Sequence, residues 1–299
     1  MKISYLVFSV LMVMAECSFA QQWMRSLSVA QDLAMVQNKM VLMVWEDTTT
    51  YPYPVLVEDE KGRKILVRNL FTDEYISPII WDYFVPVIVS EDKYEELYLQ
   101  IKGKRNQTYI DKFNDDSIKI MDVNGHILNI EPSYEMYENI TKIIEKYALH
   151  TEYLESELRN YHDKKDVYSG YFLASKYLDF AMYINAKVRP EVIDLAETYI
   201  NDTALLLENS VISDKSSVEQ RLELLAAKRD LIAERPRSAI RKLKRVERDG
   251  IDETNLSLAS FLFYTANACL GRLEEANEWK SNISSLNLKQ AQKIINLNK

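Results

Sequence analysis

The chain has 299 residues, of which 47% are hydrophobic and 27% charged, and its formal net charge is −8 at pH 7. These proportions are typical of a folded globular protein and exclude a disordered or collagen-like chain. The acidic balance argues against non-specific binding to nucleic acid or to an anionic membrane. Only six glycines and seven prolines occur, which favours helices over an all-β architecture with many turns.

The first twenty residues have the pattern of a signal peptide. Lys2 precedes a nearly continuous apolar run over residues 3–15, and Ser18-Phe-Ala20 places small residues at both positions that signal peptidase inspects. We therefore expect a mature chain that begins at Gln21, a bacterial source and an extracytoplasmic location, periplasmic or secreted; an uncleaved anchor is the alternative. Cleavage would remove Cys17, so the mature chain would form no internal disulfide. No later apolar run reaches membrane-spanning length, so no membrane span is expected after cleavage.

Strands are expected only in the first part of the chain. The patterns predict, in order, a helix over 22–37 capped at Ser28, a strand over Met40–Trp45 that ends in a loop with two prolines, and a β-hairpin over 55–67, with a helix as the alternative for 55–67. They then predict a helix over 72–81, a strand over 83–89 with Pro86 at an edge or a bulge, and a helix over 93–101. Strands over 117–122 and 126–130 follow, joined by Asn124-Gly125, the commonest hairpin turn dipeptide.

In this order the elements resemble those of the thioredoxin-like family over about residues 22–132. The segments that carry the resemblance are VAQDLAMVQNKMVLMVW, LFTDEYISPIIWDYFVPVIV and IKIMDVNGHIL. The resemblance implies a mixed sheet closed by a hairpin at Asn124-Gly125. The positions of the family's Cys-x-x-Cys pair and of its cis-proline would fall near Thr50, Tyr51, Pro52 and Tyr53, and near Asp116, respectively. Neither a cysteine nor that proline is present there, so the family's redox activity is not expected, and these five residues become candidate peptide contacts.

From residue 133 onward the pattern is wholly helical. One long helix over 133–161 is predicted, followed by helices over 168–185, 190–209, 217–234, 236–248, 254–270 and 273–286. Pro190 and Pro236 lie where first-turn prolines belong, and the short connections favour antiparallel neighbours. The segment ANACLGRLEEA over 266–276 resembles the turn of a tetratricopeptide-type helix pair, and AAKRDLIAERPRSA repeats the pattern. The spacing drifts, so a degenerate solenoid and a plain helical bundle both remain open.

The remaining reactive side chains favour structural roles. Cys269 lies on the apolar face of its helix, where a cysteine behaves as a small buried hydrophobe rather than a nucleophile. His126, His150 and His162 lack the spacing of metal ligands, and no phosphate-binding glycine loop or catalytic motif occurs. We therefore expect no metal and no cofactor.

Three further groups are expected to be ordinary surface or core. They are the aspartates at 111, 115, 116 and 122, the basic cluster over 235–248, and the tyrosines at 168, 171, 177 and 183. Binding of an acidic partner is the alternative for the basic cluster, and an interaction groove is the alternative for the tyrosines.

Together these patterns predict an α+β or α/β chain: a signal peptide over 1–20, a thioredoxin-like mixed-sheet domain over 21–132, and an all-α antiparallel helical domain over 133–299. The expected function is that of an exported, soluble, non-catalytic protein-binding or scaffold protein, whose partner is a protein or peptide and not nucleic acid. Two alternatives stay open. One is a thiol-disulfide oxidoreductase-related enzyme that acts through Cys269, and the other is an extracytoplasmic enzyme whose site assembles only in three dimensions.

Overall fold

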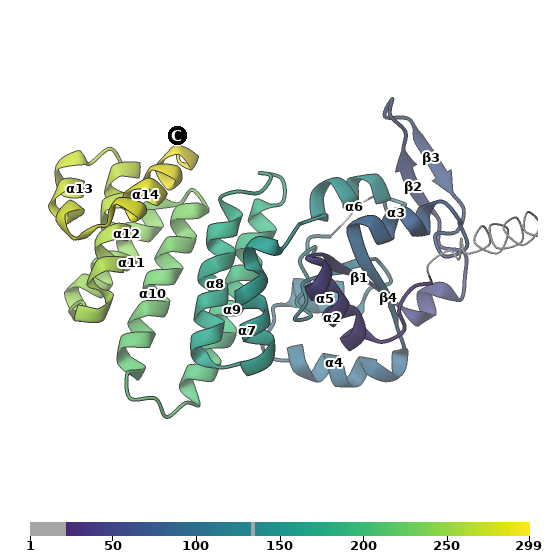
Figure 1. The fold of residues 1–299 in the computed structure, drawn as a ribbon, viewed down its shortest axis with the longest axis horizontal. Coiled ribbons are helices and arrows are strands. Elements are labelled where there is room, and N and C mark those ends of the chain that lie inside the picture. Colours follow the sequence, from purple (N-terminus) through teal and green to yellow (C-terminus); the bar gives the residue numbers. More distant parts are fainter. Residues whose placement is uncertain (1–21, 133–134) are drawn as a thin grey trace, which may run out of the picture. The chain divides into compact units, whose positions relative to one another are not determined.

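The computed structural model describes residues 22–132 and 135–299, so the predicted signal peptide and Cys17 lie outside the described residues. The fold is mixed α+β, as predicted, with a small mixed sheet and many helices (Figure 1). The chain divides into two compact units. Of the described residues, the first unit contains 22–125, 131–132 and 135–150, and the second contains 126–130 and 151–299.

The first unit holds all the strands. Its elements are α2 (Leu27–Gln37), β1 (Met40–Trp45), η1 (Glu46–Thr49), β2 (Val55–Glu58), β3 (Lys64–Val67), α3 (Ile76–Tyr83), β4 (Phe84–Val89), η2 (Glu91–Lys93), α4 (Tyr94–Ile101), α5 (Gln107–Asn114), β5 (Lys119–Met121) and α6 (Ile140–Tyr147). The predicted strands over 40–45 and 83–89 and the hairpin over 55–67 are confirmed. The first helix is capped by Ser26, whose hydroxyl accepts from the N–H of Val29, and not by Ser28 as predicted.

A three-stranded sheet in the order β4-β1-β5 forms the core of this unit. β1 runs parallel to β4 and antiparallel to β5, and every residue of β1 and β4 is buried. Strands buried on both faces are continuous apolar runs rather than alternating ones, which explains the Val-rich sequences of β1 and β4. Helices α2 and α3 pack against β4.

Pro86 occupies a position in β4 where its missing N–H costs no bond to β1. The C=O of Pro86 accepts from the N–H of Met24, which forms an isolated bridge with Val87 on the side of β4 away from β1. Because the N and the C=O of one strand residue point the same way, the nitrogen of Pro86 also faces away from β1. The edge position predicted for this proline is thus the observed one.

Two predicted elements around the end of this unit are wrong. The returning strand over 126–130 is absent: a turn closes where Gly125 N–H donates to Asp122 O at 3.0 Å, and only Ile127 of the next five residues is in a β-bridge. The single helix over 133–161 is also absent. Asn139 caps α6 by accepting from the N–H of Lys142, and α6 ends at Tyr147. A new turn then begins at Thr151, whose C=O accepts from the N–H of Leu154 at 2.8 Å.

The second unit is helical. Its elements are η3 (Glu152–Leu154), α7 (Glu155–Lys164), α8 (Val167–Ala181), α9 (Arg189–Glu208), α10 (Lys215–Ile232), α11 (Pro236–Asp249), η4 (Glu253–Asn255), α12 (Leu256–Cys269), α13 (Leu273–Trp279), η5 (Lys280–Asn282) and α14 (Ser285–Leu297). Pro190 and Pro236 lie in the first turns of α9 and α11, as predicted. The helix predicted over 273–286 is wrong in its second half, because the chain turns at η5 and begins α14 at Ser285.

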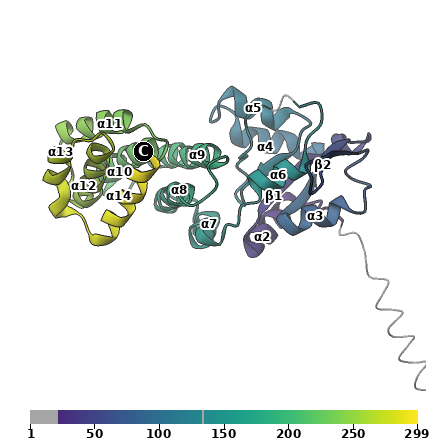
Figure 2. The same cartoon turned by 90° about the horizontal axis from the view of Figure 1, so that it is seen from above.

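Helices α8 to α13 pack on their neighbours in chain order, and α8, α10 and α12 also contact one another in turn (Figures 1 and 2). Helix α14 folds back onto α12 and α10. Its Gln290 donates to Asp179 of α8 at 2.5 Å, and the ammonium of Lys293 lies 3.3 Å from the ring centroid of Tyr183. The last helix therefore ties three earlier helices of the unit together.

Candidate functional site

The candidate site lies where β1 ends, in residues 46–53, which we call the contact loop. Its first residues form η1, a 3₁₀ turn rather than an α-helix. The Thr49 hydroxyl donates to Glu46 O at 2.8 Å, and the Thr50 hydroxyl donates to Asp47 O at 2.7 Å. Side chains that bond to nearby carbonyls in this way favour turns over helices. The three threonines at 48–50, shortly after β1, therefore favour a short turn with hydrogen bonds inside it.

The two tyrosines of the contact loop point in different directions. The Tyr51 side chain is 79% exposed, and Pro52 beside it is also exposed. Tyr53 is half-buried; its hydroxyl donates to Glu138 Oε2 at 2.5 Å, and its ring centroid lies 5.8 Å from that of Phe71. Tyr53 thus anchors the loop, while Tyr51 is presented to solvent.

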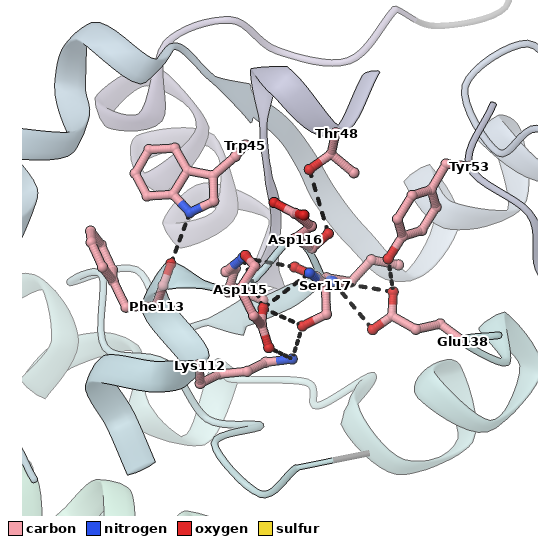
Figure 3. A network of polar contacts seen from close by, with 11 residues as sticks. Trp45, Thr48, Tyr53, Lys112, Phe113, Asp115, Asp116, Ser117 and Glu138 are labelled. Carbon is pink, nitrogen blue, oxygen red and sulfur yellow. Dashed lines mark hydrogen bonds and ion pairs between the residues drawn. The ribbon is translucent and has the colours of Figure 1, made fainter. Parts of the chain in front are cut away.

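The turn before β5, residues 115–117, lies beside the contact loop. The Thr48 hydroxyl donates to the carbonyl oxygen of Asp116 at 3.4 Å (Figure 3). Trp45, at the end of β1, donates through Nε1 to Phe113 O at 2.8 Å. The structure therefore brings Asp116 next to the loop that holds Thr50, Tyr51, Pro52 and Tyr53. In sequence, β1 and β5 are more than seventy residues apart.

Two buried lysines support the turn over 115–117. Lys119 is fully buried; its ammonium donates to the carbonyl oxygens of Asp115 and Ser117 and lies 3.1 Å from Asp115 Oδ1. Lys112 is also buried and donates to the hydroxyl of Ser117. Burial lowers the pKa of Lys119 to about 8, against the opposing effect of Asp115. Ammonium groups with carbonyl and carboxylate partners on one short turn fix the path of its backbone.

The pKa values of two carboxyl groups in this network are shifted in opposite directions. Burial raises the pKa of Glu138, against the hydrogen bond from Tyr53. Burial alone would also raise the pKa of Asp115, but Lys112, Ser117 and Lys119 outweigh it and hold that pKa below its usual value. Glu138 additionally accepts from the N–H of Ile118 at 3.1 Å, which joins the contact loop to the start of β5 through one side chain (Figure 3).

Ser117 is hydrogen-bonded in a way that orders the turn and does not activate its hydroxyl. A serine nucleophile needs a neighbouring base that accepts its proton. Here the Ser117 hydroxyl donates to Asp115 Oδ1 at 2.5 Å, and Lys112 donates to the same hydroxyl. Because Asp115 has a pKa below its usual value, it is a weak base. The arrangement is therefore suited to holding a rigid surface.

Acidic groups surround the contact loop. The pKa of Glu91, in η2 directly after β4, is raised by burial and by the nearby carboxylates of Asp47 and Asp116. These three carboxylates belong to segments that follow β1 and β4 and that precede β5. The carboxyl ends of the parallel strands β1 and β4 thus carry negative charge, at the edge of a sheet where ligands of open α/β sheets commonly bind.

Sequence reasoning missed Lys112, Lys119, Glu91 and Glu138. Lys119 stands between two isoleucines, a pattern that predicts a strand with its lysine in solvent, whereas all three residues of β5 are buried. Glu138 fell inside the long helix predicted over 133–161. In the structure Glu138 lies outside any helix, and its carbonyl oxygen accepts from the N–H of Leu56 in β2 at 2.8 Å. No local sequence pattern distinguishes a glutamate that a distant loop buries in the fold from one that stays in solvent.

The other candidate residues occupy structural positions. Burial raises the pKa of the half-buried Cys269 thiol to about 11, which favours the protonated, less nucleophilic form at neutral pH. His126 lies 3.7 Å from Asp202 and packs edge-on against the ring of Tyr199. Lys242, in the basic cluster, is paired with the buried Asp230 at 2.5 Å.

The four tyrosines proposed for a groove do not share one environment: Tyr177 is buried, Tyr171 is half-buried, and Tyr168 and Tyr183 are exposed. Among the side chains that the structure describes, no group of three or more His, Cys, Asp and Glu is placed to hold a metal ion. Within the same residues, no helix is both long and apolar enough to cross a membrane. Comparisons of the chain with protein-family models, with curated proteins and with solved structures found no match.

Proposed function

We propose that the protein is an exported, non-catalytic binding protein that recognises a peptide segment of a partner through the contact loop and the turn over 115–117. The observation that carries the proposal is the exposure of Tyr51 on a backbone held by hydrogen bonds on both sides. Tyrosine offers a large contact area with few rotatable bonds, and such residues are enriched among those that dominate binding energy.

The contact loop is already ordered in the free protein, which favours high affinity for a ligand. The hydroxyls of Thr48 and Thr50, the phenol of Tyr53 and the indole of Trp45 are all bonded within the unit. A partner that packs on Tyr51 then immobilises one side chain instead of a whole loop. Since ordering costs are subtracted from the gross interaction energy, a surface ordered in advance binds more tightly for the same contacts.

The charge around the loop indicates the partner's chemistry. Asp47, Glu91 and Asp116 make the surroundings acidic: burial raises the pKa of Glu91, and repulsion from the carboxylates of Asp47 and Asp116 raises it further. A cationic side chain on the partner would relieve this repulsion and would speed association at low salt. The proposed ligand is therefore an extended segment with a basic residue beside an apolar one.

Two features of the fold support the architecture proposed with this function. The strand order β4-β1-β5, with β1 parallel to β4 and antiparallel to β5, fits the thioredoxin-like domain implied by the resemblance, without its closing strand. The stack of α8 to α13, in which alternate helices also touch, fits a tetratricopeptide-like solenoid. Folds of both kinds host many activities, so the binding function depends on the site and not on the fold.

A displayed library of random peptides tests the proposal. Ligands selected on the purified protein are measured by fluorescence anisotropy against the wild type, Tyr51→Ala and Tyr75→Ala. Tyr75 is a matched control because it is 80% exposed, as Tyr51 is 79% exposed. We expect Tyr51→Ala to weaken binding at least about tenfold and Tyr75→Ala to change it less than about threefold. Failure to select any ligand, or equal losses in both variants, would overturn the proposal.

A further inference from the structure

The hairpin β2–β3 has one occupied edge and one open edge. On the β2 side, Leu56 N–H donates to Glu138 O and Glu58 N–H donates to Thr141 Oγ1, both at 2.8 Å. Along the other side, no strand or bridge in the described parts of the chain pairs with β3 (Figure 1). β3 is therefore an edge strand whose outward main-chain groups are free to pair with another chain.

The register identifies these outward groups. Leu56 lies opposite Leu66, and Glu58 lies opposite Lys64. In an antiparallel ladder, two opposite residues direct their N–H and C=O groups either toward each other or both away from each other. Because Leu56 and Glu58 donate away from β3, Leu66 and Lys64 direct their groups away from β2. An extended chain can add to β3 through these two residues without disturbing the hairpin.

The side chains at this edge are apolar and exposed. Ile65 and Leu66 are each 51% exposed. Neighbouring residues of a strand point to opposite faces of the sheet, so one apolar side chain lies on each face. An added strand with apolar side chains at alternate positions would cover Leu66 on one face or Ile65 on the other.

Charge decides between the possible occupants. Residues 61–68 contain Lys61, Arg63, Lys64 and Arg68 and no acidic residue, in a chain whose net charge is −8. Pairing with a second copy of β3 would bring together two segments whose charged residues are all basic, which like-charge repulsion disfavours. Arg63 is paired with Asp59 at 2.6 Å, and Lys64 interacts electrostatically with Glu135. Both Lys64 and Arg68 are nevertheless exposed at the edge. An acidic segment complements them.

We propose that β3 is a docking edge for an extended segment of a partner protein that carries apolar residues flanked by aspartate or glutamate. Main-chain hydrogen bonds to Lys64 and Leu66 would supply the pairing, and the exposed apolar and basic side chains would supply the sequence preference. This surface is formed by other residues than the contact loop, and the two differ in ligand: the ligand proposed for β3 is acidic, and the ligand proposed for the contact loop is basic.

The variant Leu66→Pro tests the proposal most selectively. Proline removes the outward N–H of residue 66 but no bond to β2, so the hairpin itself is preserved. Leu66→Thr is the matched control, because it retains the N–H and changes only the side chain. The probes are a synthetic peptide of alternating valine and threonine flanked by glutamates, and a twin with lysines in place of the glutamates. Anisotropy gives the dissociation constants, and amide hydrogen exchange locates the contact.

We expect the glutamate peptide to bind and to slow exchange at the amides of Lys64 and Leu66. Leu66→Pro should weaken this binding about tenfold or more, and Leu66→Thr should weaken it less. Should Leu66→Pro prove unfolded, the charge reversal of Lys64 and Arg68 to glutamate replaces it and should produce a similar loss. Tyr51→Ala should leave the binding unchanged, which separates this test from that of the contact loop.

Four results of the peptide experiments would overturn the inference. They are the absence of binding by the glutamate peptide, equal binding by the lysine twin, undiminished binding by Leu66→Pro, and exchange protection away from residues 63–68. Concentration-dependent self-association that Leu66→Pro abolishes would also refute it, because the occupant would then be a second copy of the chain.

Discussion

Replacing Tyr53 with phenylalanine should loosen the contact loop by removing a single hydrogen bond. The Tyr53 hydroxyl donates to Glu138 Oε2 at 2.5 Å in a half-buried site, and burial together with Glu138 raises the pKa of Tyr53, so the proton stays on the phenol. A hydrogen bond of this kind, whose acceptor is a carboxyl group, contributes about 1–3 kcal/mol to the free energy of unfolding. Glu138 retains the N–H of Ile118 as a partner, so the loss should not exceed this range.

The assay is urea unfolding of the first unit, followed by the fluorescence of its three tryptophans (Trp23, Trp45 and Trp81) in a Trp279→Phe background. Tyr51→Phe is the matched control, since its exposed hydroxyl should contribute less than about 0.5 kcal/mol. A double-mutant cycle with Glu138→Gln should show coupling between the two side chains. A Tyr53→Phe variant no less stable than Tyr51→Phe, or a cycle without coupling, would show that this hydrogen bond does not stabilise the contact loop.

Three further changes test the packing of the second unit. Asp230→Ala should cost about 2–3 kcal/mol in thermal unfolding, because it removes the carboxylate paired with Lys242 and one of the two carboxylates paired with Arg229, which keeps Glu197. The pKa of Asp230 is held below its usual value despite burial, so this stability should be lost as the pH falls below about 3.8, the usual value, and should be absent in the variant. Gly170→Ala should destabilise by about 1–3 kcal/mol despite its better helix propensity, since the new Cβ would collide with the Thr203 hydroxyl, and Thr203→Ala in the same chain should restore part of the loss. Alkylation of Cys269 at pH 8, followed by mass mapping, should be about a hundredfold slower than that of an ordinary cysteine, and an equal rate would contradict the raised pKa.

Local patterns were sufficient to predict the elements that bury a continuous or periodic apolar surface. Met40–Trp45 forms β1 with the predicted bounds because a Val-rich run buried on both faces has no competing helical pattern. Pro190 and Pro236 predicted the starts of α9 and α11, because a proline is favoured in the first turn of a helix. The β2–β3 hairpin around Gly62 was predicted by its β-rich flanks, and Gly62 adopts the positive φ that such a turn requires.

Distant contacts account for the parts that were missed. The apolar periodicity after residue 133 predicts one helix that continues past Asn139. In the structure, the side chain of Asn139 instead caps α6 and donates to Glu58 of β2 at 2.8 Å. Helix α5 begins at a similar asparagine cap, Asn106, in a segment too short and polar to show helical periodicity. In the candidate site, Asp116 and the contact loop were both named from the sequence as candidate peptide contacts, and the structure places them side by side. The buried charges beneath them depend on partners far along the chain, which local patterns do not show.

Amide hydrogen exchange in the presence of a selected peptide ligand shows whether the contact loop is the binding surface. We expect slower exchange over residues 46–53 and 115–117, and the loss of this protection in Tyr51→Ala, because the ligand is expected to pack on the exposed ring of Tyr51 beside Asp116. A tightly bound ligand that slows exchange only elsewhere in the chain, with these two segments unchanged, would contradict this expectation.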